Sequence, residues 1–338
     1  MPRAARHATR SVAEGPATEY SRATLCQYLR MNARTLPESQ LQVHTSEPPR
    51  LLLRSRFSEL IGSRETLARL ARKEVKVKYT SSVLGAAWAM LNPILYLVVF
   101  TLVFDVVLKA RLPNFPVYLL SGLLAWNLFA TSLSMSARSV VDNASLVTKV
   151  YFPREYLPLS TVGAALVDFA LQALVLVLFM LGSRTGVLGL NLLLIPLSML
   201  ALLAFTSAVG MVVASLNVRY RDTQHLLAVA LMLWFWLTPI VYSSGQLQHR
   251  LANHSLFGIS LFDVYLINPM ADIIFGFQRA LYGHVCVMFR GAQQCVLPNV
   301  GLGWLALLLG ALCVGCLTLL YLAWRLFFRL SGDFAEEL

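Results

Sequence analysis

Six long apolar stretches constrain the fold of this chain more than any other feature of its sequence. A helix of about 20 apolar residues crosses the ~30 Å hydrocarbon core of a bilayer. The chain has 57% hydrophobic and only 13% charged residues, whereas a soluble domain carries about 25% charge. We therefore predict an all-α integral membrane protein with six transmembrane helices. The predicted spans are Ala87–Leu108, Tyr118–Ala137, Leu159–Leu181, Leu190–Leu216, Leu226–Tyr242 and Gly301–Phe327.

A further apolar run, from Leu256 to Phe277, is interrupted by Asp263 and Asp272. Carboxylates are costly inside hydrocarbon, so a seventh span is a poor explanation of this run. One or two short helices that dip into the outer leaflet and return explain it better. The sequence thus predicts short re-entrant external helices before the last span.

Lysine and arginine residues lie mostly on one side of the predicted spans. Residues 1–86, the loops Arg138–Pro158 and Val218–His225, and the carboxyl tail hold 22 of the 28. Positively charged short loops stay in the cytoplasm, which places both termini there, and an even number of spans agrees. The net charge of +11 is therefore explained by membrane orientation, and no nucleic-acid partner is expected.

The chain divides into four regions. Residues 1–56 are polar, rich in arginine and broken by prolines, which predicts a mobile cytoplasmic tail. Residues 57–86 hold an amphipathic basic helix and a turn into the first span. Such a helix lies in the plane of an anionic leaflet, although a solvated basic helix would show the same pattern. Residues 87–328 form the transmembrane domain, and residues 329–338 a cytoplasmic carboxyl tail.

The chain lacks the common motifs of enzymes that act on nucleotides, peptides or polyprenyl lipids. It contains no G-x-x-x-x-G-K-[ST] loop, no H-E-x-x-H metal helix and no aspartate-rich diphosphate–magnesium motif,. We expect no enzyme activity and neither a metal nor a cofactor bound by this chain. ATP and magnesium would belong to a separate ATPase chain.

Asp168 lies in the middle of the third predicted span. A carboxylate at the bilayer centre costs about 2.5–3.5 kcal/mol on insertion scales, so its side chain should face protein or water. It could lie on a proton pathway, or it could be a buried hydrogen-bonding partner. The lack of a second charge within the spans favours the hydrogen-bonding interpretation.

Two pairs of cysteines call for different interpretations. Cys286 and Cys295 lie on the side predicted to be external, where a disulfide is permitted, and the sequence leaves open whether they pair. Cys313 and Cys316 lie one turn apart in the last span. With no other ligand types near them, they are better explained as small packing residues than as a metal site.

Five short motifs occur in order along the chain. They are Tyr79–Trp88 with Asn92-Pro93, Lys149–Glu155, Asn217–Asp222, Thr238–Tyr242 and Asn268–Met270. Together they resemble ABC-2 type polysaccharide export permeases, the membrane subunits that export O-antigen, capsule, teichoic acid or galactan precursors. The resemblance covers about Phe57 to Phe328.

The resemblance implies a homodimer of six-span subunits docked to two copies of a cytoplasmic ABC ATPase. It implies a substrate that is an undecaprenyl-diphosphate-linked glycan moving outward across a bacterial inner or plasma membrane, among membrane lipids. Two other classes stay open from the residues alone: a proton-coupled secondary transporter that uses Asp168, and a membrane-embedded polyprenyl-lipid transferase.

We expect the substrate path to begin where the interface helix turns into the first span. Basic residues there can attract a diphosphate, and Gly85 suits a sharp turn, although it could instead relieve crowding between helices. Trp88 and Tyr96 could meet the first sugars, and the resemblance adds Trp234 and Trp236 of the fifth span. The predicted path residues are Arg72, Lys73, Lys76, Lys78, Leu84, Gly85, Trp88, Tyr96, Trp234 and Trp236.

The loop Arg138–Pro158 is the predicted docking surface for the ATPase. Ser145–Lys149 can form a short helix that Pro153 ends, and a rigid helix can transmit a rigid-body motion. A loop that serves only membrane topology is the alternative. In the next cytoplasmic loop, Arg221 and Asp222 could hold the loop against the amino-terminal helix or the partner, or form a solvated pair. The predicted coupling residues are Lys149, Phe152, Pro153, Arg154, Glu155, Arg221 and Asp222.

Overall fold

The structure is a computed structural model. It describes residues 64–80, 85, 87–103, 113–149, 152–183, 189–251, 255–256, 259–283, 285–289, 292–298, 300–332 and 334–337. All of these belong to one unit of the chain, residues 58–338. The predicted tail (1–56), the start of the interface helix (57–63), Leu84 and the end of the first predicted span (104–108) lie outside the described residues.

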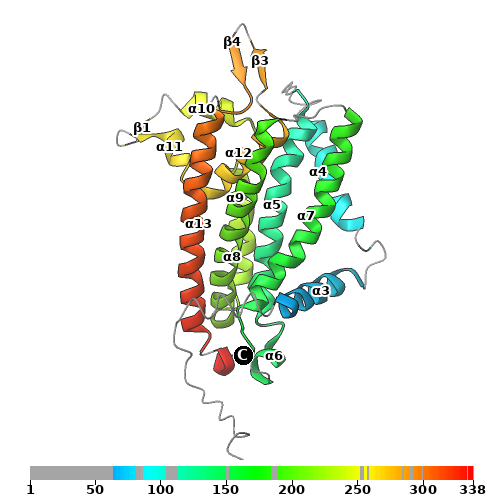
Figure 1. The fold of residues 1–338 in the computed structure, drawn as a ribbon, viewed down its shortest axis with the longest axis vertical. Helices are drawn as coiled ribbons and strands as arrows, with labels where there is room; N and C mark the ends of the chain where they lie inside the picture. The colour runs from blue at the N-terminus through cyan, green and yellow to red at the C-terminus, as the bar shows by residue number, and fades with distance from the viewer. Residues whose placement is uncertain are drawn as a thin grey trace, which may run out of the picture. The chain divides into compact units, whose positions relative to one another are not determined.

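Helices account for most of the described chain (Figure 1). They are α3 (Arg64–Thr80), α4 (Ala87–Thr101), α5 (Phe115–Ser139), α6 (Ala144–Lys149), α7 (Tyr156–Ser183), the 3-10 helix η3 (Leu190–Leu193), α8 (Leu194–Arg219), α9 (Thr223–Leu237), α10 (Ser244–Leu251), α11 (Leu261–Tyr265), α12 (Pro269–Leu281), α13 (Leu302–Leu330) and α14 (Phe334–Glu337). Two pairs of short strands are β1 (Ser255–Leu256) with β2 (Ile259–Ser260), and β3 (Cys286–Phe289) with β4 (Ala292–Cys295).

Each of the six predicted spans contains an apolar helix. Among the described residues, α5, α7, η3 with α8, and α13 are long and apolar enough to cross a membrane, with 25, 28, 30 and 29 residues. The helices α4 and α9 have 15 residues each. At 1.5 Å per residue they extend about 22 Å, less than the ~30 Å of hydrocarbon. The structure therefore supports a multi-pass helical protein with four helices of spanning length in its described part.

The fifth predicted span ends earlier than its hydropathy indicates. We predicted that it reaches Tyr242, but α9 ends at Leu237 and Thr238 is extended, with φ −110° and ψ 139°. Proline disfavours helical geometry in the residue before it, and Pro239 follows Thr238 directly. The apolar Ile240 is buried after this turn and not within the helix. Hydropathy alone could not separate a buried turn from a continuing span.

Burial differs strongly among the long helices and separates inner from outer positions. The apolar window of α5 is 78% buried, whereas those of α7 and α13 are each 22% buried. The core of the bundle forms where α5 packs against α7, α8, α9 and α12. The exposed apolar faces of α7 and α13 suit contact with lipid chains, since a surface of this kind is unusual in water.

Short elements fill the segment between α9 and α13. The apolar run that we assigned to short external helices forms α11 and most of α12. The Asn268 side chain caps α12 by accepting a hydrogen bond from the Met270 amide at 3.2 Å. The predicted helical class is confirmed, and two short antiparallel ladders, β1–β2 and β3–β4, are added to it. These strands have two to four residues each, too few to give a clear alternating pattern.

The two ends of the bundle carry different elements. Figure 1 shows α3, α6 and the carboxyl end of the chain at one end, and β3 with β4 at the other. Contacts among α6, α8 and α14 agree with this arrangement. We call the first the α6 end and the second the hairpin end.

Candidate functional site

The interface helix α3 lies against α7 at a very short distance. If Gly163 of α7 carried a Cβ atom, that atom would lie 3.2 Å from the Cβ of Ala71 in α3. Small residues at a crossing let two helix backbones approach closely. The predicted amphipathic helix is therefore a packed part of the bundle, and not a detached surface helix.

Asp168 joins the same two helices through polar contacts. Its side chain is buried in α7, with 6% exposure; it forms an ion pair with Lys78 and accepts a hydrogen bond from the Tyr79 hydroxyl. Burial, and then the hydrogen bond to Asp168, raise the pKa of Tyr79 above its usual value, so Tyr79 remains a donor. These contacts match the hydrogen-bonding interpretation of Asp168 and supply the cation partner that the sequence analysis did not find.

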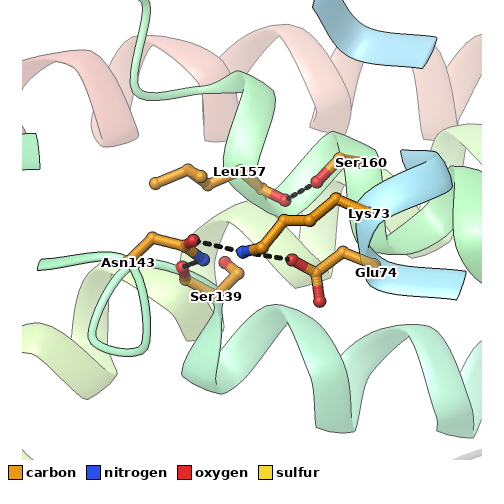
Figure 2. A network of polar contacts seen from close by, with 6 residues as sticks. All are labelled: Lys73, Glu74, Ser139, Asn143, Leu157 and Ser160. Atoms are coloured by element: carbon orange, nitrogen blue, oxygen red, sulfur yellow. Dashed lines mark hydrogen bonds and ion pairs between the residues drawn. The ribbon is translucent and has the colours of Figure 1, made fainter. Parts of the chain in front are cut away.

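A second network fixes α3 to the turn between α5 and α6 (Figure 2). The Lys73 ammonium donates to the Asn143 side-chain oxygen at 2.6 Å and contacts the Glu74 carboxylate at 3.1 Å. Asn143 in turn donates to the Ser139 carbonyl at the end of α5, at 2.8 Å. Because Asn143 is buried, this network links the interface helix to the start of the predicted docking loop.

The four predicted basic residues of α3 therefore have different roles. Lys73 and Lys78 anchor the helix through the contacts above. Arg72 and Lys76 are exposed, and neither side chain has a polar partner among the described residues. Residues four apart share one face of a helix, so Arg72 and Lys76 present a fixed pair of cationic groups. Lys73 and Lys78 already have polar partners, and the part of all four residues in a substrate path stays a prediction.

Gly85 has the left-handed backbone that the predicted turn requires. Its φ is +48°, and its carbonyl accepts a hydrogen bond from the Trp88 amide at 3.3 Å. An added Cβ would meet the Tyr79 carbonyl oxygen only at 4.0 Å, which gives no support to crowding as the reason for glycine. Backbone conformation is the reason, because residues with a side chain rarely adopt this region.

The predicted aromatic path residues fall into an exposed and a packed group. Trp88 and Tyr96 of α4, and Trp236 of α9, are 52%, 40% and 55% exposed. Trp234 instead donates its ring nitrogen to the Asn268 side chain at 2.9 Å and packs edge-on against Phe129 at 5.2 Å. Trp234 thus positions the start of α12.

The two helices that carry these aromatics share α5 as a neighbour. The helix α4 packs on α5 and α7, and α9 packs on α5 and α8. A path between the first and fifth spans of one chain therefore stays a prediction and is not a site that these contacts bring together.

The predicted docking loop contains the short helix expected of it. The helix α6 runs over Ala144–Lys149, with Lys149 exposed and Val147 buried. Phe152 packs on the same apolar cluster as Val147, and the Pro153 carbonyl accepts the Tyr156 amide at 3.2 Å to close the turn into α7. The loop is ordered by contacts with its own bundle.

The carboxyl end of the chain completes this cluster. Arg154 donates to the Ser331 carbonyl just after α13, and Glu155 next to it is buried. Phe334 of α14 is 1% exposed and packs edge-on against Phe327 at 5.5 Å. The sequence predicted only a cytoplasmic carboxyl tail for residues 329–338. An apolar residue inside a charged terminal segment was the signal that could have found this contact.

The loop between α8 and α9 is anchored by a residue that we did not select. Arg219 forms an ion pair with Glu337 at 3.3 Å. Arg221 and Asp222 are exposed in the turn, and neither forms an ion pair with a described residue. Their contact with the amino-terminal helix is not found there, and a contact with a partner chain stays a prediction.

At the hairpin end, Cys286 and Cys295 are joined by a disulfide across β3 and β4, where the two residues lie opposite each other. The sequence had left this pairing open. Cys313 and Cys316 are buried without a disulfide. No group of three or more His, Cys, Asp or Glu side chains in the described part of the chain could hold a metal ion.

The sequence matches the family model described as ABC-2 type transporter over residues 65–254. The chain therefore belongs to the ABC-2 type transporter family. Members of this family are membrane subunits of transporters and not themselves enzymes. The matched region includes α3, the α6 loop and the turn between α8 and α9.

Relatives with curated names narrow this class. The chain is 36% identical to the O-antigen export system permease protein RfbA of Myxococcus xanthus over 227 residues, which are 67% of this chain and 84% of that protein. It is 31% identical over 215 residues to a protein of the same name from Klebsiella pneumoniae, covering 62% of this chain and 77% of that protein. The family and the apolar helices together identify a multi-pass membrane subunit of an ABC exporter.

Proposed function

We propose that this chain is the transmembrane subunit of an ATP-driven exporter for an undecaprenyl-diphosphate-linked polysaccharide. The names of its relatives support a glycan substrate. The glycan would move outward from the cytoplasm across a bacterial inner or plasma membrane. The chain would act as a homodimer with two copies of a cytoplasmic ATPase subunit, at which ATP and magnesium bind.

One observation carries the proposal: a basic helix is fixed rigidly at the α6 end. Lys73 and Lys78 hold α3 in place, which leaves Arg72 and Lys76 exposed on one face. A cationic residue near a membrane surface contributes about 1 kcal/mol to the binding of an anionic lipid group. Held at a constant position, the two residues can collect a lipid diphosphate beside the bundle.

The turn at Gly85 would then direct the lipid-linked glycan along the first span. Leu84 precedes the turn, and the exposed Trp88 and Tyr96 follow it on α4. Aromatic faces can stack on the apolar faces of sugar rings. In a homodimer, the exposed Trp236 of one subunit could face α4 of the other, which would join the two parts of the path across the subunit boundary.

The α6 end would receive the ATPase. Lys149 is exposed at the end of α6, and Arg221 and Asp222 are exposed in the neighbouring turn. Phe152 packs on the apolar cluster that contains Phe327 of α13, Arg154 donates to the Ser331 carbonyl, and Glu155 is buried. A motion of the ATPase would therefore reach the spans through packed contacts.

This function requires the α6 end to face the cytoplasm. The excess of lysine and arginine in the loops at that end supports this orientation. It places both termini in the cytoplasm and the disulfide hairpin outside, where oxidation is permitted. Six spans follow if α4 and α9 cross the bilayer with the help of their flanking residues.

The proposal is tested in proteoliposomes that contain the chain, its ATPase and a lipid-linked glycan. Arg72→Glu with Lys76→Glu should lower the apparent affinity for the glycan lipid about tenfold, and the loss should depend on salt because exposed charges are screened. Arg64→Glu, which reverses an exposed charge at the start of the same helix, is the matched control.

Equal glycan transport by the double variant and the control would remove the electrostatic part of the proposal. Transport without ATP, driven by a proton gradient, would support the secondary transporter instead. The contacts of Asp168 with Lys78 and Tyr79 favour an anchoring role over proton coupling. No contact among the described residues favours a transferase.

A further inference from the structure

Side chains of α11, α12 and the start of α13 line an apolar pocket. These helices lie at the hairpin end (Figure 1). The pocket is separate from the basic face of α3 and from the α6 loop. Its wall comes from four segments that are distant in sequence from α3. Its apolar lining includes Phe262, Leu266, Phe275, Pro298, Trp304 and Leu308.

Arg279 is the charged residue of this lining. It lies in the last turn of α12, and its Nε and Nη1 atoms are buried without a hydrogen bond to any described residue. Burial lowers the pKa of Arg279 from its usual value, but a guanidinium in a protein keeps its charge. Buried donors without acceptors are costly, so an anionic group in this pocket would be strongly favoured.

The protein itself offers no such anion nearby in its described part. Asp272 precedes Arg279 by two turns on α12, but the two residues form no ion pair, and the Asp272 Oδ1 atom is also buried without a partner. A buried polar group without a hydrogen bond therefore lies near each end of α12: the Asp272 carboxyl near its start and the Arg279 guanidinium near its end. Of the two, the guanidinium lines the pocket.

The surface around the pocket has the character of a lipid-facing surface. Trp304 in the first turn of α13 is 48% exposed, and Leu307 on the next turn is 73% exposed. Ile267, between α11 and α12, is 75% exposed. Tryptophan at a helix end beside exposed apolar residues is typical of the membrane interface.

We propose that this pocket binds an anionic phospholipid of the external leaflet. The phosphate accepts hydrogen bonds from Arg279, whose planar guanidinium matches the geometry of phosphate oxygens, and an acyl chain occupies the apolar lining. Since the pocket joins α12 to α13, the bound lipid fixes these helices to each other. The assignment to the external leaflet rests on the orientation given in the proposed function.

Lipid titration of the purified full-length chain in neutral detergent tests this inference. Thermal stability is measured against phosphatidylglycerol and against phosphatidylcholine with the same acyl chains. Phosphatidylglycerol should stabilise the wild type more. Arg279→Gln should weaken its binding about tenfold or more, because a charge-assisted hydrogen bond is lost, and Arg279→Lys should restore part of it.

A second variant tests the apolar part of the site. Leu308→Trp fills the pocket without a change of charge, and it should weaken phosphatidylglycerol binding as well. Arg325→Gln, which removes a positive charge from the other end of α13, should leave the binding unchanged.

Unchanged phosphatidylglycerol binding in both Arg279→Gln and Leu308→Trp would overturn the site. Equal stabilisation by the two phospholipids would overturn its preference for an anionic lipid. Stronger binding of undecaprenyl phosphate than of phosphatidylglycerol, lost in Arg279→Gln, would assign the pocket to the carrier lipid. Because these measurements need neither ATPase nor glycan, their failure would not affect the export proposal, and a failure of export would not affect them.

Discussion

At Asp168, a carboxylate buried in α7 meets a lysine that precedes it by 90 residues. Removal of one member of a fully buried pair costs about 3–5 kcal/mol. The Lys78 side chain is 39% exposed, so we expect a smaller loss of about 1–3 kcal/mol for Asp168→Asn. The expected result is a lower Tm of the detergent-purified chain.

A double-mutant cycle separates this pair from general effects of the substitutions. Lys78→Met keeps the length of the side chain, and its loss should not add to that of Asp168→Asn, because both remove the same contact. Additive losses would show that the ion pair does not hold α3 on α7. Proton-driven uptake that disappears in Asp168→Asn would point to a proton pathway.

Gly85 supports a second prediction at the residue scale. At a φ of +48°, a side chain costs about 1–2 kcal/mol, and a β-branched one more. Gly85→Val should therefore strongly reduce the proposed glycan export, while the proposed complex of permease dimer and ATPase still assembles. Gly85→Asn should be milder, because asparagine visits this region more readily.

Gly303→Val is the matched control for Gly85. Gly303 lies on an exposed face of α13, and a Cβ there would meet no atom within 4 Å. Full export by Gly85→Val in proteoliposomes would contradict the need for a left-handed turn.

At the scale of elements, α14 joins the two loops of the α6 end. Phe334→Ala removes a buried ring that packs on Phe327, and a core truncation of this kind costs about 3–5 kcal/mol when fully buried. We expect α14 to detach while the spans stay inserted. The ATPase activity stimulated by the permease should fall, and the level of the chain in membranes should not.

Leu322→Ala provides a comparison on α13, because Leu322 is 58% exposed and its truncation leaves no cavity. Equal ATPase stimulation by Phe334→Ala and Leu322→Ala would show that α14 does not take part in coupling.

The elements that the sequence predicted well are those with a strong local signal. Apolar length located a helix in all six spans, and the proline and serine pattern located α6. The early end of α9 was missed because Ile240 and Val241 are apolar although they lie in a buried turn. The strands β3 and β4 were missed because four residues are too few for an alternating pattern.

The contacts of the candidate site were harder to predict than its residues. Lys78 and Asp168 were both selected, but for different roles, since nothing local to either residue indicates its partner. Arg154 and Ser331 are 177 residues apart. The ion pair between Arg219 and Glu337 also joins residues that are distant in the sequence. Pairing at such separations depends on how helices cross, which periodicity does not encode.

At the scale of the whole molecule, the proposed orientation predicts which residues react from each side of the membrane. Thr148 of α6 is exposed. In a variant whose other reactive cysteines are removed, the cysteine of Thr148→Cys should react with an impermeant maleimide in inverted vesicles. Cys286 and Cys295 should react from the outside of spheroplasts, and only after reduction of their disulfide.

Labelling of Thr148→Cys in intact spheroplasts would show that the orientation is the opposite of the proposed one and that the basic face of α3 lies outside. Labelling of both positions from one side would mean that α9, which lies between them in the chain, does not cross the bilayer. A variant that keeps only Cys313 and Cys316, which are buried, gives the background.

The contact between Lys78 and Asp168 also bears on how the chain is made. The ribosome synthesises α3 before α7. Lys78 therefore lies at the membrane surface without its counter-ion until Asp168 is synthesised. When the third span enters the bilayer, a cation already in place can lower the cost of inserting its aspartate. Substitution of Lys78 could therefore reduce the yield of inserted protein during biogenesis, before any substrate is moved.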